Sequence, residues 1–182
     1  MQRPKRTYCK SIAKQREAFM VAVPLAASRD IRPLHADDIE RVIAIDRAYS
    51  GHSRRRFFEK RFAAVEVRPE DFIHVGVVQD GVLRGYAIAR VLRGEFGRKQ
   101  AVAVLDAIGV DAESRERGVG QALMAELNAM MSRRNIHALQ SQAEWTNQDL
   151  MRFFAAAGFQ LAPRLTLQRP VAARLDEPSE QV

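Results

Sequence analysis

The chain has 182 residues, 47% of them hydrophobic, and a formal net charge of +7 at pH 7. This is the size of one domain with a substantial buried core, and the single cysteine, Cys9, excludes an intrachain disulfide and a cysteine-based metal cluster. The positive balance favours an anionic partner. Because the sequence contains no recognisable nucleic-acid module, we expect an anionic cofactor or substrate rather than nucleic acid.

The first 28 residues form an N-terminal extension that starts basic and continues with a short apolar run. The pattern superficially resembles a secretory signal, but Glu17 interrupts its junction and Pro24 lies inside the apolar run. The run is also too short to span a membrane. We expect a flexible or helical extension on a cytoplasmic protein, unless translation begins at Met20 instead of Met1.

The first part of the chain predicts one strand followed by two helices. Residues 31–34 form a short apolar strand, and apolar residues recur at helical spacing from Ile39 onward. A second helix is expected after Ser53, which is a candidate N-cap. Phe58 and Phe62 lie four positions apart and are predicted to face the core.

Three strands are expected next. Residues 73–78 and 86–92 are rich in β-forming side chains and are joined through Asp80 and Gly81, a strong hairpin signal. After a charged turn, residues 101–110 form a further apolar strand.

A glycine-rich loop follows this strand and leads into a predicted helix over residues 121–131. The loop reads Arg115, Glu116, Arg117, Gly118, Val119 and Gly120. Glycines let backbone N–H groups gather around an anion, and the helix start adds free donors and the positive end of its dipole. Two arginines add charge and fork-shaped donors. The loop therefore predicts a site for a phosphorylated ligand, without the Lys-Ser/Thr pair of a Walker loop.

The last part of the chain predicts a strand, a helix and two short strands. The strand covers residues 138–143, and Thr146 or Asn147 is expected to cap the helix that ends at Gly158. Residues 159–161 and 165–168 are expected to close the sheet. Residues 172–182 form a polar tail that we expect to be frayed.

Three of these patterns, in this order, resemble the GNAT N-acetyltransferases. The Arg-x-x-Gly-x-Gly loop after Ile108-Gly109-Val110 resembles the coenzyme A pyrophosphate loop of that family. Asn147, followed by a helix with an aromatic pair and a Gly-Phe step, resembles a second family signature. Residues 30–34 with the aspartates that follow resemble its first strand and the start of its first helix.

The resemblance covers residues 29–171 as one domain and implies the mixed α/β GNAT fold. In that fold two neighbouring parallel strands splay apart, here residues 101–110 and 138–143. It further implies acetyl-CoA as co-substrate, no metal, and direct transfer to a primary amine of a small metabolite or protein. The resemblance also allows a homodimer.

The cofactor residues implied by the resemblance lie at the strand end, in the loop and in the later helix: Ile108, Gly109, Val110, Arg115, Glu116, Arg117, Gly118, Val119, Gly120, Gln121, Asn147 and Phe154. The Val110 N–H is the candidate oxyanion contact. The family usually has tyrosine at the position of Phe154, and phenylalanine has no proton to give to the leaving thiolate. This departure favours the alternative of a non-catalytic acyl-CoA-binding regulatory domain.

Asp106 is the candidate base, since it lies four residues before Val110 in an otherwise apolar strand. Period-two alternation predicts that Asp106, Ile108 and Val110 share one face. Apolar surroundings are expected to raise the pKa of the Asp106 carboxyl, as a base requires. The alternative is a structural carboxylate paired with an arginine. Glu144 is a second candidate.

Three consecutive arginines, Arg54, Arg55 and Arg56, lie between the first two predicted helices, where GNAT proteins generally shape the acceptor pocket. Positive charge at a helix N-terminus opposes the helix dipole, and a bound anion would relieve that cost. The cluster therefore suggests an acidic acceptor. The alternative is a solvated helix start. We expect neither nucleic acid nor a membrane as partner.

Overall fold

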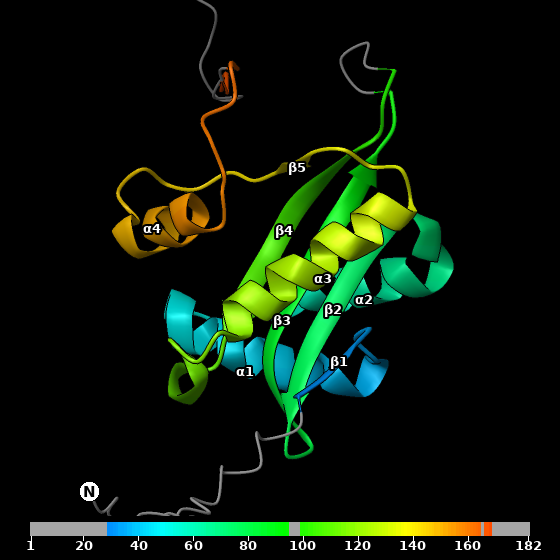
Figure 1. Ribbon diagram of the computed structural model, residues 1–182. Helices are drawn as coiled ribbons and strands as arrows, with labels where there is room; N and C mark the ends of the chain where they lie inside the picture. The colour runs from blue at the N-terminus through cyan, green and yellow to red at the C-terminus, as the bar shows by residue number, and fades with distance from the viewer. Residues whose placement is uncertain (1–28, 95–98, 165, 169–182) are drawn as a thin grey trace, which may run out of the picture. The chain divides into compact units, whose positions relative to one another are not determined.

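The computed structural model describes residues 29–94, 99–164 and 166–168, and the expected extension and tail lie outside them. The chain divides into two compact units, the second beginning at Ala143. The first unit is built on a five-stranded sheet with the order β1-β2-β3-β4-β5. Neighbouring strands are antiparallel except β4 and β5, which are parallel. This mixed α/β architecture confirms the predicted fold class (Figure 1).

As far as α4, the elements follow the predicted order. The first unit consists of β1 (Arg29–Arg32), α1 (Ile39–Ser50), α2 (Arg55–Val67), β2 (Phe72–Gln79), β3 (Val82–Leu92), β4 (Val102–Val110), α3 (Val119–Arg133) and β5 (Leu139–Gln140), with short 3-10 turns at Ala36–Asp38, Pro69–Asp71 and Ala112–Ser114. The second unit contains α4 (Gln148–Ala156). No helix in the described ranges is long and apolar enough to cross a membrane.

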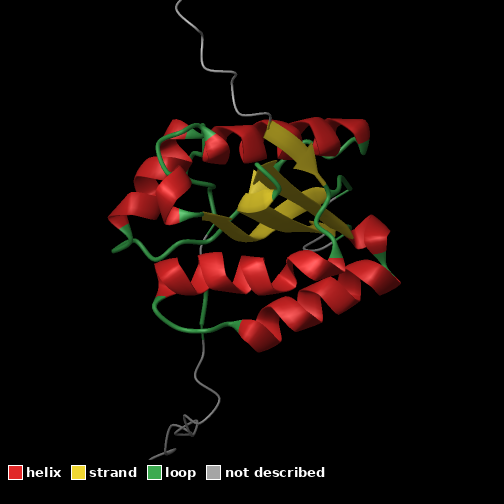
Figure 2. Cartoon of the chain, turned by 90° about the horizontal axis from the view of Figure 1, so that it is seen from below, coloured by secondary structure: helices red, strands yellow, loops and turns green. Residues whose placement is uncertain are grey.

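Helices cover both faces of the sheet (Figure 2). Alternate residues of β3 identify the helix that lies on each face. A Cβ atom placed on Gly85 would lie 2.6 Å from Val119 Cγ1, so this position faces α3. The next residue, Tyr86, faces the other way and meets the Phe58 ring of α2 edge-on at 5.7 Å between centroids. The absence of a side chain at Gly85 lets α3 lie close to the sheet.

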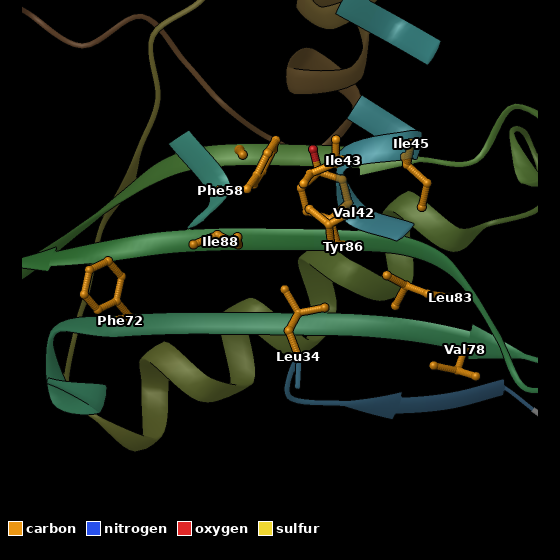
Figure 3. Close-up of a cluster of buried hydrophobic side chains, with 11 residues drawn as sticks. Leu34, Val42, Ile43, Ile45, Phe58, Phe72, Val78, Leu83, Tyr86 and Ile88 are labelled. Atoms are coloured by element: carbon orange, nitrogen blue, oxygen red, sulfur yellow. The ribbon is translucent and has the colours of Figure 1, made fainter. Parts of the chain in front are cut away.

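The core on the α1 and α2 side gathers apolar side chains from β2, β3 and both helices (Figure 3). Phe58, Val42 and Tyr86 are fully buried there. The predicted inward face of α2 is therefore confirmed at Phe58, while Phe62 is partly buried and packs against the same cluster.

The predicted hairpin is confirmed by its backbone. Asp80 and Gly81 connect β2 to β3 with φ angles of 51° and 74°. Two consecutive residues with positive φ are typical of the type I′ turn, whose twist matches that of the flanking strands. Glycine at the second position adopts this conformation without strain.

Two predictions about element ends are wrong. Ser53 does not cap α2, which begins at Arg55 after Arg54, and Arg54 makes no side-chain cap bond. The described residues after α4 form no strand, and the sheet ends at β5. Leu161 and Leu167 are 94% and 89% exposed, so this segment gains none of the burial that would stabilise further strands.

Candidate functional site

The strand β4 departs from regular pairing at Asp106. Its neighbours Leu105 and Ala107 pair with consecutive residues of β3, so Asp106 is an extra residue in the ladder. Such a β-bulge turns two successive side chains toward the same side. Asp106 contacts Arg61 of α2, and Ala107 belongs to the core on that same face.

The prediction that Asp106, Ile108 and Val110 share one face is therefore wrong. Val110 lies opposite Gly85, the residue that faces α3, and Ile108 has the same orientation two positions earlier. The physical reason is the inserted residue, because one extra position shifts the period-two alternation of every residue beyond it.

The second edge of β4 has a strand partner only near its beginning. Within the described residues, β5 pairs with Ala103 and Val104, and no strand pairs with this edge between Leu105 and Val110. This separation is the splay that the sequence predicts. It leaves a row of backbone groups along the β4 edge without strand partners.

The register identifies which backbone groups these are. The N–H of Asp111 donates to the carbonyl of Arg84 at 2.8 Å, so these two residues form a hydrogen-bonded pair at the end of β3 and β4. In an antiparallel ladder such pairs alternate with pairs whose N–H and C=O groups point away from each other. Ile108 and Val110 belong to the second kind. Their N–H and C=O groups therefore point to the open edge, whereas those of Gly109 point to β3.

The loop after β4 turns sharply into α3. Glu116 and Gly118 have positive φ angles of 59° and 77°, and Gly118 is the residue that precedes the helix. The bond from the Ala122 N–H to the Gly118 carbonyl, at 3.0 Å, opens the helical ladder. The helix therefore supplies no acceptor to the N–H groups of its first turn, which belong to Val119, Gly120 and Gln121. These donors and the helix dipole make the loop suitable for an anion.

Basic side chains from the loop itself and from β1 lie around this loop. The guanidinium of Arg115 lies 5.8 Å from the ring centroid of Tyr49 at the end of α1. Arg29 of β1 donates a hydrogen bond to the carbonyl of Arg117. Arg29 and Arg117 also line a pocket of about 270 Å³. Arg29 was missed in the sequence because only the pairing of β1 with β2 brings it to the loop.

Asp106 lies between two arginines on the α2 face. Arg90 Nε of β3 donates to both carboxylate oxygens, at 2.9 and 2.7 Å, and Arg61 Nε lies 2.7 Å from Oδ2. The Asp106 side chain is only 6% exposed. The structure thus contains the arginine-paired carboxylate of the second sequence interpretation. A catalytic role for Asp106 stays a prediction.

The sequence matches the family model described as the acetyltransferase (GNAT) family over residues 38–159. The chain belongs to the GNAT family. The predicted resemblance is thereby confirmed, and the open edge of β4 and the loop before α3 lie inside the matched residues. A comparison with curated proteins finds no significant match.

Solved structures share the GNAT fold at low sequence identity. The aminoglycoside N-acetyltransferase AAC(6')-Iy in complex with CoA is 21% identical, with a TM-score of 0.66, 82% of this chain covered and 99% of that chain. A transcriptional regulator from Bacillus halodurans C-125 is 14% identical, with a TM-score of 0.67 and coverages of 79% and 99%. The aminoglycoside 6'-N-acetyltransferase AAC(6')-Ih from Acinetobacter baumannii is 16% identical, with a TM-score of 0.62 and coverages of 79% and 98%.

A buried polar network joins the first two helices of this GNAT domain to β3. Tyr86 is fully buried, and its hydroxyl donates to Asp46 Oδ1 at 3.2 Å. Arg54 donates to both oxygens of the same carboxylate. Burial, together with the charge of Asp46, raises the pKa of the Tyr86 hydroxyl far above its usual range. Tyr86 is therefore a core residue that remains protonated.

The arginines before and within α2 are largely paired inside the chain. Arg55 donates to both oxygens of Glu40 at 2.5 and 2.7 Å, and Arg54 is held by Asp46. Arg56 is exposed. Two of the three positive charges that suggested an acidic acceptor are therefore already balanced by carboxylates. Acceptor binding by these arginines stays a prediction.

In the second unit, Asn147 caps α4 as predicted. Its Oδ1 accepts a hydrogen bond from the Leu150 N–H at 3.1 Å. Phe154 is buried and packs against the rings of Phe153 and Phe159, with centroids 5.7 and 4.7 Å away. Contact of Asn147 and Phe154 with a cofactor stays a prediction.

Proposed function

We propose that this GNAT domain is an acetyl-CoA-dependent N-acetyltransferase that moves an acetyl group directly to a primary amine of a small metabolite or protein. The observation that carries the proposal is the open edge of β4, which continues directly into the anion-binding loop. Acetyl-CoA combines a chain of amide groups with a pyrophosphate. One continuous segment of this protein offers matching groups for both parts.

The fit to coenzyme A rests on backbone geometry. The N–H and C=O groups of Ile108 and Val110 point to the open edge and are suited to pair with the amides of the pantetheine arm. The first turn of α3 and the loop arginines are suited to the pyrophosphate. Asn147 is expected to add a contact from α4.

Acetyl transfer requires a polarised thioester oxygen, an unprotonated amine and a stabilised leaving thiolate. The bound coenzyme supplies the activated acetyl group as its thioester. The Val110 N–H is the proposed donor to the oxygen in the tetrahedral state. Asp106 is the proposed residue that orients the amine or accepts its proton. The amine nitrogen forms the new amide bond as the C–S bond breaks. Because Phe154 has no hydroxyl group, the proton for the leaving thiolate comes from water or from the substrate.

The structural neighbours support an amine acceptor in general terms. Two are named as aminoglycoside N-acetyltransferases, one of them in complex with CoA, and another is named as an aminoglycoside acetyltransferase. Because all of these neighbours are below 25% identity, they do not identify the acceptor of this protein. An acetyl-CoA requirement is consistent with a cytoplasmic location, which we also propose. A homodimer is the oligomeric state to test first.

A second candidate is an acyl-CoA-binding regulatory domain without catalysis. Phe154 favours it, because the family usually places a tyrosine there. A structural neighbour named as a transcriptional regulator shows that this fold is not limited to proteins named as enzymes. The two functions share the cofactor site and differ in whether an amine releases the thiol.

The test is calorimetric titration of the full chain with acetyl-CoA, followed in the same sample by detection of free thiol with a panel of primary amines. We expect saturable binding and amine-dependent thiol release. Binding without release from any amine would favour the regulatory domain. No binding would contradict the assignment of the loop.

Amide hydrogen exchange tests the proposed backbone contacts of acetyl-CoA at individual residues of β4. Acetyl-CoA is expected to slow exchange at Ile108 and Val110, whose N–H groups point to the open edge. Ala107 and Gly109 are the internal controls, since their N–H groups already bond to β3. Equal changes at all four amides would contradict the proposed binding mode.

A further inference from the structure

We propose that Arg61 and Arg90 bind a carboxylate of the amine acceptor, so that the substrate is a small amine that also carries negative charge. This inference rests on the proposed acetyltransferase function and names the substrate class for it. The residues concerned are distinct from the three consecutive arginines at the start of α2.

The hydrogen bonds of the two arginines leave most of their donors free. Among the described residues, Asp106 receives hydrogen bonds only from Nε of Arg90, and Nε is also the Arg61 nitrogen that lies nearest to the carboxylate. The N–H of Arg61 Nε is buried and not aligned with any acceptor in the described part of the chain. The four terminal Nη atoms make no hydrogen bond to a described residue. A guanidinium group binds a carboxylate through two parallel hydrogen bonds, and terminal nitrogens such as these can donate them.

The net charge of this cluster and the exposure of its arginines also favour binding of a carboxylate. One carboxylate faces two guanidinium groups, so the cluster retains a net positive charge. Asp106 is 6% exposed, whereas the side chains of Arg61 and Arg90 are 24% and 39% exposed. The arginines are therefore more accessible to solvent than the carboxylate. The Arg61 guanidinium also lies over the Phe57 ring, 5.1 Å from its centroid, which restricts its movement.

The cluster lies on the strand that carries the proposed reaction centre. Asp106 precedes Val110, whose N–H is the proposed donor to the thioester oxygen, by four residues, which is about 13 Å along a strand. It is also located where β5 leaves β4 and the open edge begins. A carboxylate held by Arg61 and Arg90 would leave an amine a few bonds away within reach of a thioester on that edge. This spacing fits a compact amino acid and disfavours a polycationic amine, which the positive charge would repel.

The test compares acceptors that differ in the carboxylate alone. Thiol release is measured with 4-aminobutyrate against n-butylamine, and with L-glutamate against L-glutamine, for the wild type, Arg61→Gln, Arg90→Gln and Arg90→Lys. Arg93→Gln is the matched control, since Arg93 follows in the same segment and pairs with Asp71 at 2.7 Å.

We expect the wild type to prefer the carboxylated amine of each pair. In each glutamine variant the ratio of KM for the neutral amine to KM for the carboxylated amine should fall by about tenfold or more, which corresponds to the loss of one charge-assisted hydrogen bond. A change that acts through Asp106 would affect both amines alike and leave this ratio unaltered. Arg90→Lys should recover part of the loss, and Arg93→Gln should behave as wild type. Equal use of both amines, or equal losses for both in the variants, would overturn the inference while leaving the transferase intact.

A binding measurement without turnover separates the two proposals. The CoA-loaded protein is titrated with glutarate, a dicarboxylate without an amine. Weaker binding by Arg61→Gln and Arg90→Gln than by Arg93→Gln and wild type supports the carboxylate site. Indistinguishable binding overturns it. Absence of amine-dependent thiol release contradicts the transferase proposal alone, and the glutarate result still decides the arginine site.

Discussion

Replacement of Gly118 by alanine tests the anion-binding loop directly. Gly118 has a φ of 77°, and a Cβ atom there would come no closer than 3.4 Å to its nearest neighbour, Arg29 Nη1. Steric overlap is therefore minor, and the cost is conformational. A residue with a Cβ in the left-handed region costs about 1–2 kcal/mol.

This cost should appear in both stability and cofactor affinity. In Gly118→Ala the free loop can relax from the left-handed conformation, and binding of the pyrophosphate must restore it. A penalty of about 1 kcal/mol corresponds to a dissociation constant for acetyl-CoA raised about fivefold, and the full range reaches about 30-fold. The free energy of unfolding should fall by up to about the same amount.

The matched control is Gly94→Ala, at the opposite end of β3 from the loop. Gly94 has a φ of 87°, and a Cβ atom at this position would have no neighbour within 4 Å, so the backbone penalty is similar. We expect a comparable loss in denaturant-measured stability but an unchanged calorimetric dissociation constant for acetyl-CoA. Unchanged affinity in Gly118→Ala, or an equal loss of affinity in Gly94→Ala, would refute the role of the loop.

Three further changes probe the scaffold around the site. Tyr86→Phe removes the buried hydrogen bond to Asp46 and should lower the free energy of unfolding by about 1–2 kcal/mol in denaturant titrations, whereas an unchanged value would show that the bond contributes nothing. Burial, and secondly the charge of Arg134, lowers the pKa of His74, whose Nδ1 accepts from the Leu34 N–H. The unfolded state then takes the proton first, so stability should fall as pH drops below about 6.5, and less steeply in His74→Asn. Gly85→Ala places a Cβ 2.6 Å from a side chain of α3 and should lower the free energy of unfolding by about 1–3 kcal/mol. Thermal melting at the wild-type temperature would contradict this expectation.

The sequence predicts the order of the elements well because each signal is local. Period-two and period-3.6 patterns are read within single segments, and the Asp80-Gly81 turn carries its own conformational preference. The glycine loop and the helix after it were predictable for the same reason, since they are consecutive in the chain. Anion binding by this loop stays a prediction. Asn147 as a cap is a further local signal that the structure confirms.

The partners of side chains were less predictable because pairing brings together residues distant in the chain. Asp106 in an apolar strand was compatible with a base or with an ion pair, and only the β3–β4 register and the packing of α2 place Arg90 and Arg61 beside it. The bulge that turns Asp106 toward α2 has no sequence signal of its own here. Strict alternation therefore assigned the wrong face to this residue.

The two halves of the site consequently differ in kind. The proposed cofactor half consists of backbone groups of β4 and the first turn of α3, so it depends on the open edge and on the glycine at position 118. The proposed acceptor half depends on side chains from β3, β4 and α2 that meet only in the folded chain. A fold shared at 14–21% identity can therefore preserve the first half while the second changes its charge. For this reason the arginines around Asp106, and not the likeness to aminoglycoside acetyltransferases, are the better guide to the acceptor.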